Sequence, residues 1–325
     1  MRIASAQSSP ARGGIRRQRG CEGNSAIAPD RFTRFAAIDW SGARGSSHKG
    51  IAVAVCETGD AAPVLVAPPG RAWSRMAVHD WLLDQADTGL LVGLDLSPAF
   101  PFIDAGAYFP GWHDSPADAR ALWAMVDALA VGDADFAADG FLADPDTRRH
   151  FRQHRDCGDL FPGGAGRMRV CEIGTRAMGL SPTSSFNLVG AAQVGKASLT
   201  GMRVLHSLQK RVPIWPFDPV PDRGTLIVEI YTTIAARAAG IRAGRSKMRD
   251  AASLDAALIA LGSRPHVSLP RYDDHATDAI LTAAWLRVSA GRPDLWAPSG
   301  LTPHIARTEG WTFGVPSVTG YFAAS

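Results

Sequence analysis

Two short apolar runs that each end in an aspartate constrain the fold of this chain more than any other feature. The first run, 34–39, reads Arg-Phe-Ala-Ala-Ile-Asp, and the second, 90–95, reads Leu-Leu-Val-Gly-Leu-Asp. Near-continuous apolar runs of this length are typical of strands that are buried on both faces, as in sheets covered by helices. Ligands bind outside the carboxyl ends of the strands in open α/β sheets. The sequence therefore predicts an α/β fold with Asp39 and Asp95 pointing into one crevice.

Further strands and a helix are expected around these two runs. The β-branched run 50–56 and the short apolar run 63–67 follow the first aspartate closely, which predicts an antiparallel meander of three strands. A helix that Ser74 could cap is expected to run to about residue 86. A third buried-strand pattern, 225–231, reads Thr-Leu-Ile-Val-Glu-Ile-Tyr and contains Glu229.

The rest of the chain divides into a tail, an insertion and a helical C-terminal part. Residues 1–33 are rich in Ser, Gly, Arg and Ala without periodicity, which predicts a flexible basic tail before one domain spanning 34–325. A mostly helical insertion is expected at about 100–223, ending in a proline-rich loop, 212–221. Helices are predicted at 116–130, 184–210, 232–239, 251–261 and 274–290, and a last short strand at 311–315.

Composition limits the classes of protein that this chain can belong to. Hydrophobic residues make up 46% and charged residues 20%, so a sizeable core is expected. The net charge of +3 arises largely in the tail and does not by itself indicate nucleic-acid binding. No apolar run approaches the roughly 20 residues that span a bilayer. We therefore expect a cytoplasmic protein without membrane contact and with reduced cysteines, and no oligomeric state is predicted.

The acids of the buried patterns form a candidate metal site. Asp274 and Asp278 lie four residues apart in a predicted helix and so share one face. Two carboxylates about 4 Å apart repel by roughly 4 kcal/mol at an effective dielectric near 20, so a fold keeps such a cluster when a cation sits in it. Oxygen ligands favour Mg²⁺ or Mn²⁺, and two such ions can support phosphodiester cleavage.

Each acid also has an ordinary structural interpretation. Asp39 could be a turn residue, and Asp95 could cap the segment that follows it. Asp274 falls in the first helical turn, where any acid is favoured by the helix dipole, so Asp278 is the better candidate ligand. Glu229 lies within an apolar strand, where a carboxylate is costly to bury without a partner.

The order of strands and helices resembles the ribonuclease-H-like fold, and the local motifs resemble one branch of it, the domain of unknown function 429 family of predicted nucleases. The matching stretches are Ala-Ala-Ile-Asp-Trp-Ser-Gly-Ala at 36–43, Val-Gly-Leu-Asp-Leu-Ser-Pro-Ala-Phe-Pro at 92–101, Cys-Glu at 171–172, Trp-Pro-Phe-Asp at 215–218, Val-Glu-Ile-Tyr at 228–231, Asp-His-Ala-Thr-Asp-Ala at 274–279 and Glu-Gly-Trp-Thr-Phe-Gly-Val-Pro at 309–316. Thr232 stands where the family's Glu-x-Tyr motif continues with proline.

The resemblance implies a mixed five-stranded sheet, with three antiparallel strands and then two parallel ones, flanked by helices. It implies a magnesium- or manganese-dependent nuclease with Asp39, Asp95, Asp278 and Glu229 as catalytic metal ligands. His275 resembles a ligand or supporting residue of related resolvases, although a plain helix-start histidine is an equal alternative.

Basic residues of the insertion are candidates for contact with a nucleic-acid substrate, with Arg169 and Lys196 foremost. A solvated helix face is the simpler interpretation of Lys196, and a local ion pair with Glu172 is the simpler one of Arg169. Two other functions are compatible with the sequence. One is an actin-like or sugar-kinase-like ATPase, and the other is a non-catalytic binding module with the same fold.

Overall fold

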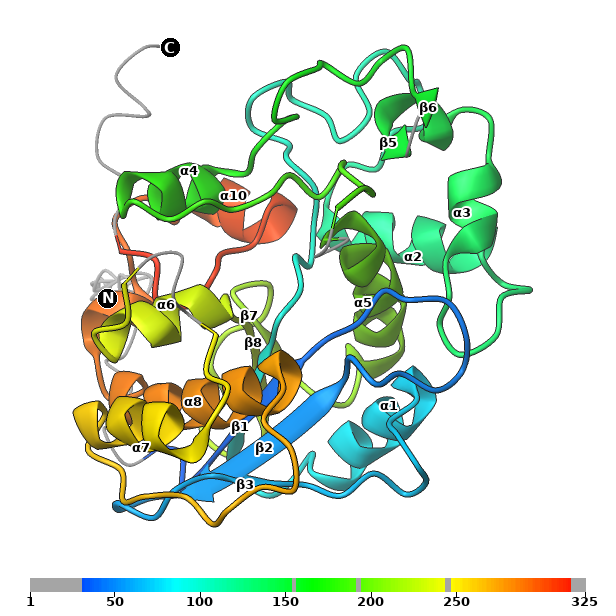
Figure 1. The fold of residues 1–325 in the computed structure, drawn as a ribbon. Coiled ribbons are helices and arrows are strands. Elements are labelled where there is room, and N and C mark those ends of the chain that lie inside the picture. Colours follow the sequence, from blue (N-terminus) through cyan, green and yellow to red (C-terminus); the bar gives the residue numbers. More distant parts are fainter. Residues whose placement is uncertain (1–30, 154–155, 191–193, 243–246, 317–325) are drawn as a thin grey trace, which may run out of the picture.

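The computed structural model describes residues 31–153, 156–190, 194–242 and 247–316, which form one mixed sheet of six strands with helices on both faces (Figure 1). The strand order is β3-β2-β1-β4-β8-β7. The bounds are β1 (Arg34–Asp39), β2 (Ala52–Glu57), β3 (Val64–Leu65), β4 (Leu90–Leu94), β7 (Ile214–Trp215) and β8 (Leu226–Glu229).

The sheet confirms the predicted meander followed by parallel strands. β1 pairs antiparallel with β2, β2 pairs antiparallel with β3, and β4, β8 and β7 follow β1 in parallel pairing. This arrangement is consistent with a ribonuclease-H-like topology. The prediction of five strands was wrong by one, because β7 forms inside the proline-rich stretch 212–221 that we expected to be a loop.

The strands alternate their side chains between two hydrophobic clusters, one on each face of the sheet. In β1, Ala36 and Ile38 belong to one cluster, and Phe35 and Ala37 belong to the other. One face is covered by α6 (Thr232–Ala238), α7 (Ala251–Ala260) and α8 (Asp274–Ser289). The opposite face is covered by α1 (Arg75–Asp84), α2 (Ala119–Leu129) and α5 (Val194–Leu208).

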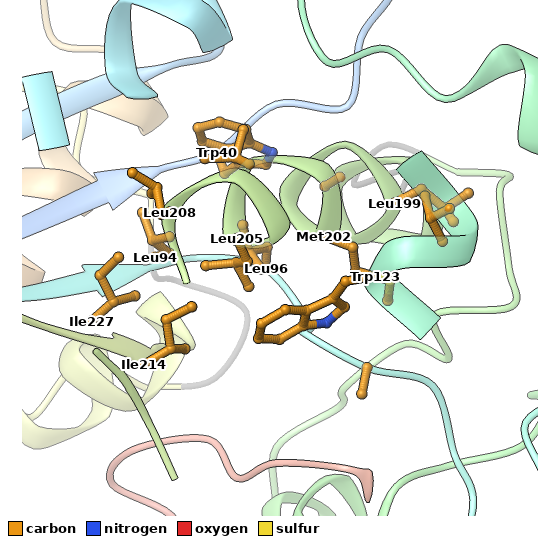
Figure 2. Packing of buried hydrophobic residues seen from close by; sticks show 14 of the residues in the cluster. Trp40, Leu94, Leu96, Trp123, Leu199, Met202, Leu205, Leu208, Ile214 and Ile227 are labelled. Carbon is orange, nitrogen blue, oxygen red and sulfur yellow. The ribbon is translucent and has the colours of Figure 1, made fainter. Parts of the chain in front are cut away.

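Two of these helices lie close to the carboxyl ends of the central strands. α8 contacts β1 and β2 along its length (Figure 1). On the other face, Leu205 and Leu208 of α5 pack beside Leu94 and Ile227 (Figure 2). Trp40, directly after β1, donates its indole N–H to the Thr200 hydroxyl at 3.0 Å. Both helices are therefore held near the strand ends where Asp39 and Asp95 lie.

Most predicted helices form, with shifted ends. Ser74 caps α1 by accepting a hydrogen bond from the Ala77 amide at 3.0 Å, as predicted. The predicted helix 184–210 is shorter, since residues 184–190 are not helical and α5 spans Val194–Leu208. The predicted strand 311–315 is wrong, because only Thr312 forms an isolated bridge there, to Glu229.

The insertion between β4 and β7 extends the hydrophobic cluster on the α5 face of the sheet with aromatic side chains. Phe100, Phe109, Phe151 and Phe186 contact one another, with the Phe100 and Phe186 rings stacked at 4.8 Å between centroids. Besides α2 and α5, its elements are α3 (Asp139–Ala143), η1 (Thr147–His150), β5 (Arg152–Gln153), β6 (Asp156–Cys157) and α4 (Val170–Ala177). Two short helices, α9 (Pro293–Trp296) and α10 (Pro303–Thr308), lie near the C-terminus.

Most of the predicted tail, residues 1–30, lies outside the described residues. Its last residues, 31–33, are described and lie against the domain. Arg31 donates to the Pro221 carbonyl at 2.6 Å, and Phe32 is buried against Trp296. Across the described ranges, no helix has the length and apolarity needed to cross a bilayer.

We expect a side chain at Gly93 to destabilise the fold by about 1–3 kcal/mol through overpacking. A β-carbon there would lie 2.5 Å from Cγ2 of Ile230 and 3.0 Å from Cδ1 of Leu286, between β4 and α8. The free energy of unfolding of Gly93→Ala, measured in urea, checks this. Gly70→Ala is the control, because nothing lies within 4 Å of its β-carbon position. Equal stability of the two variants would contradict the tight packing of β4 beneath α8.

Candidate metal centre

Asp39 and Asp95 meet at the carboxyl ends of two neighbouring parallel strands, as predicted. Ile38 pairs with Leu94, so the two aspartates occupy the next equivalent positions, and the Asp95 amide donates to the Ile38 carbonyl at 3.0 Å. Both residues line a cavity of about 660 Å³. The first turns of α8 bring Asp278 to the same cavity, and Glu229 of β8 lines it as well, so all four predicted ligands lie at one cavity.

Asp39 is buried and has a histidine partner. Its side chain lies 3.3 Å from Nδ1 of His275, one turn before Asp278 on α8. Burial raises the pKa of Asp39, and the hydrogen bond with His275 opposes this only in part. The same hydrogen bond raises the pKa of His275 against the effect of its partial burial. The prediction that His275 supports the acids is thus consistent with its position.

The other two aspartates lie in an environment that disfavours their ionised forms. Burial raises the pKa of Asp278 to about 7, and the negative charges of Asp39 and Asp274 add to the effect. Burial also raises the pKa of Asp95 well above its ordinary value, followed by repulsion from Asp39, Asp278 and Glu229. A bound cation would remove this penalty, because an opposite charge favours the ionised carboxylate.

Asp274 has a different environment from Asp278. It forms ion pairs with Lys247 at 2.8 Å and with Arg249 at 3.0 Å. The preceding residue, Asp273, caps α8 by accepting from the Ala276 amide. Asp274 therefore has cationic partners of its own, which agrees with our preference for Asp278 as the candidate ligand.

Glu229 lines the cavity but is held by an arginine. In β8, Leu226 and Val228 belong to the cluster beneath α8, while Ile227 belongs to the opposite cluster, so Glu229 points away from α8. Its carboxylate accepts two hydrogen bonds from Arg169, one of them at 2.8 Å from Nη1, and one from the Thr312 hydroxyl at 2.8 Å. This ion pair satisfies the buried carboxylate without a metal ion.

Arg169 is a buried structural cation in this arrangement, 1% exposed. Its Nε donates to Glu172, Nη1 donates to Glu229 and to the Glu309 carbonyl, and Nη2 donates to Glu229 and to the Ser97 hydroxyl. An arginine has five side-chain N–H groups, so no donor remains for a substrate. The prediction that Arg169 contacts phosphate is therefore not supported by its geometry, and the local pair with Glu172 is one part of a larger cluster.

Lys196 lies away from the acids. It sits at the start of α5, beside Gly42. The absence of a side chain at Gly42 allows this close approach, because a β-carbon on Gly42 would lie 2.2 Å from the Ala197 amide nitrogen. Lys196 lines a small separate hollow and not the cavity with Asp39. The cavity is also lined by residues that were not predicted as part of the site, among them Lys49 on the loop after β1 and Thr232 just after β8. The position of Thr232 just after the third buried strand was the available signal.

The donor chemistry at this cavity fits a hard divalent cation, because the convergent ligands are carboxylates. The repulsion among Asp39, Asp95 and Asp278 also favours a cation. As the side chains lie, however, the described residues contain no group of three or more His, Cys, Asp and Glu side chains that could hold a metal ion. Binding an ion between all three aspartates would thus require their side chains to turn toward one another.

Comparison of the chain with models of protein families, with curated proteins and with solved structures finds no match. The resemblance to the domain of unknown function 429 family therefore stays a prediction that rests on the sequence motifs.

The raised pKa of Asp278 predicts that stability falls as pH rises from about 4 to 7. The unfolded carboxyl loses its proton near its ordinary pKa of 3.8, while the folded protein keeps the proton until about 7. Each unit between the two pKa values is worth about 1.4 kcal/mol. We expect Asp278→Asn to reduce this fall, measured as urea midpoints at pH 4.5 and 7.5. A slope as steep as that of the exposed control Asp87→Asn would contradict the burial of Asp278.

Removing the Arg169 guanidinium should destabilise the protein by about 3–5 kcal/mol, since buried carboxylates would lose their partner. The change is Arg169→Met, and calorimetric melting measures it. Arg149→Met is the control, because its ion pair with Asp159 is exposed on the surface and should leave the melting temperature unchanged. Adding Glu229→Gln to Arg169→Met should restore part of the loss, and failure of this restoration would contradict the pairing.

Proposed function

We propose that this chain is a metal-dependent nuclease in which Asp39, Asp95 and Asp278 hold Mg²⁺ or Mn²⁺. The observation that carries the proposal is the convergence of these aspartates, from two adjacent parallel strands and a facing helix, in one cavity. Six carboxylates line this cavity against three permanent cations, so the carboxylates outnumber the cations when they are ionised. A polyanionic substrate would be repelled by such a cavity unless cations neutralised it first.

The chain's own residues would arrange the reaction. Divalent ions at carboxylates can activate water and stabilise the leaving oxygen of a phosphodiester. Asp39 and Asp95 are held in place by the β1–β4 pairing. Nδ1 of His275 lies 3.3 Å from the Asp39 carboxylate and would hold its direction. Glu229, paired with Arg169, supports the end of β8 in this proposal and is not a first choice as a ligand.

The sequence motifs support the same proposal independently of the cavity, since the family they resemble consists of predicted nucleases. The non-catalytic module is the competing function, and one observation favours it: the side chains as they lie do not form a ready metal site in the described ranges. Metal binding separates the two possibilities.

We expect Mn²⁺ to raise the melting temperature at pH 7.5, because an ion that binds only the folded state stabilises it. At an ion concentration 100 times Kd the gain is about 2.7 kcal/mol. Asp39→Asn with Asp95→Asn should abolish both the shift and any manganese-dependent phosphodiester cleavage, whereas the exposed Asp87→Asn should keep both. If the double variant melts with the same Mn²⁺ shift as the wild type, the metal lies elsewhere and the proposal fails.

A further inference from the structure

We propose that the substrate of this site is a nucleotide-sized phosphodiester, either a free dinucleotide or the end of a single strand, and that Lys49 binds its anionic part. This inference rests on the proposed nuclease function. It follows from the size of the cavity, from the burial of Asp39 in its lining and from the pairing of its cations.

The aspartates line a partly open cavity of limited size. The cavity of about 660 Å³ falls in the range of roughly 300–1,000 Å³ that is typical of small-molecule sites. Asp39 in its lining is buried, with 9% of its surface exposed. A duplex is a broad cylinder, wider than a cavity of this volume, so we expect its backbone to be a poor fit to these buried carboxylates. One or two nucleotide units could enter.

The insertion contributes residues to the lining of the cavity. Thr183, Val194 and Ala197 line the cavity from the insertion, opposite the strand ends. Tyr231, after β8, adds an aromatic side chain to the same lining, against which a base could stack. Without the insertion, the strand ends would be open, and a double-stranded substrate could reach the aspartates.

Lys49 differs from the other cations of the cavity. Arg44 forms an ion pair with Asp139, and Arg169 is consumed by buried carboxylates. Lys49 is exposed on the loop after β1 and has no ion pair within the described part of the chain. Among the permanent cations of the lining, the Lys49 ammonium is thus the one without an ion pair in the described ranges, and we propose that it meets the phosphate.

The loop between β1 and β2, which carries Lys49, is held by hydrogen bonds at Ser41 and at His48. The amide of the preceding residue, His48, donates to the Trp73 carbonyl at 2.8 Å, and its Nε2 lies 2.9 Å from Asp135. Buried Arg75 donates through Nε to the Ser41 carbonyl at 3.0 Å. The backbone at Lys49 is therefore fixed before substrate arrives, while its side chain can reach toward the cavity.

The test compares Lys49→Gln with Lys196→Gln, a matched lysine that also lacks an ion pair in the described ranges but lies outside the cavity. With Mn²⁺ present, three substrates are offered: a dinucleotide, a single-stranded oligonucleotide and a covalently closed circular duplex. We expect cleavage of the first two and at least about tenfold slower cleavage of the third. Lys49→Gln should raise KM, and weaken binding of a nucleoside monophosphate in calorimetry, on the order of tenfold with little change in kcat. Lys196→Gln should match the wild type.

The outcomes separate this inference from the proposed function. Cleavage of the closed duplex at the rate of the dinucleotide would overturn the inference and leave the nuclease proposal standing. Equal KM and equal nucleotide binding in the two lysine variants would overturn the role of Lys49. Cleavage of none of the substrates, together with an unchanged melting temperature in Mn²⁺, would overturn the nuclease proposal and the inference that rests on it.

Discussion

The Arg169 guanidinium joins the parts of the molecule that surround the cavity. It binds Glu229 at the end of β8, Glu172 in α4, Ser97 after β4 and the backbone carbonyl of Glu309 near the C-terminus. A buried carboxylate without a partner is strongly disfavoured, so these segments stabilise one another only while they stay together. The ends of the sheet, the insertion and the C-terminal segment are thereby locked around one space.

Two groups of carboxylates meet at this space, and their electrostatic situations are opposite. Glu229 and Glu172 have a buried cation between them and need nothing further. Asp95 and Asp278 are buried without a cationic partner, and burial and neighbouring carboxylates raise the pKa of each. The first group of carboxylates therefore has a partner inside the protein, and the second group has none. This contrast is the physical basis of our proposal that a metal ion binds on the α8 side of the strand ends.

The surroundings of the aspartates restrict what can reach them. Aromatic residues of the insertion, such as Phe100 and Phe186, belong to the same hydrophobic cluster as the strands, so the insertion is packed firmly beside the strand ends. The loop after β1 also lines the cavity and is held by Arg75 and His48. Our proposal of a small or terminal substrate depends on these fixed sides, because a wide ligand would have to displace packed elements.

The sequence alone determined the elements whose signals are local. Apolar runs identified β1, β4 and β8, and the Ser74 cap and apolar spacing identified α1, because burial and capping depend on neighbouring residues. The convergence of Asp39 and Asp95 followed from parallel strands that each end in an acid. Only the tertiary structure decided which partner the Glu229 carboxylate binds. Its side chain points away from α8 and pairs with Arg169, which is 60 residues distant in sequence. The tertiary structure also decided that β7 joins the sheet. It decided that Lys49 lines the cavity while Lys196 does not. Both depend on contacts between residues far apart in sequence, and no local pattern encodes these.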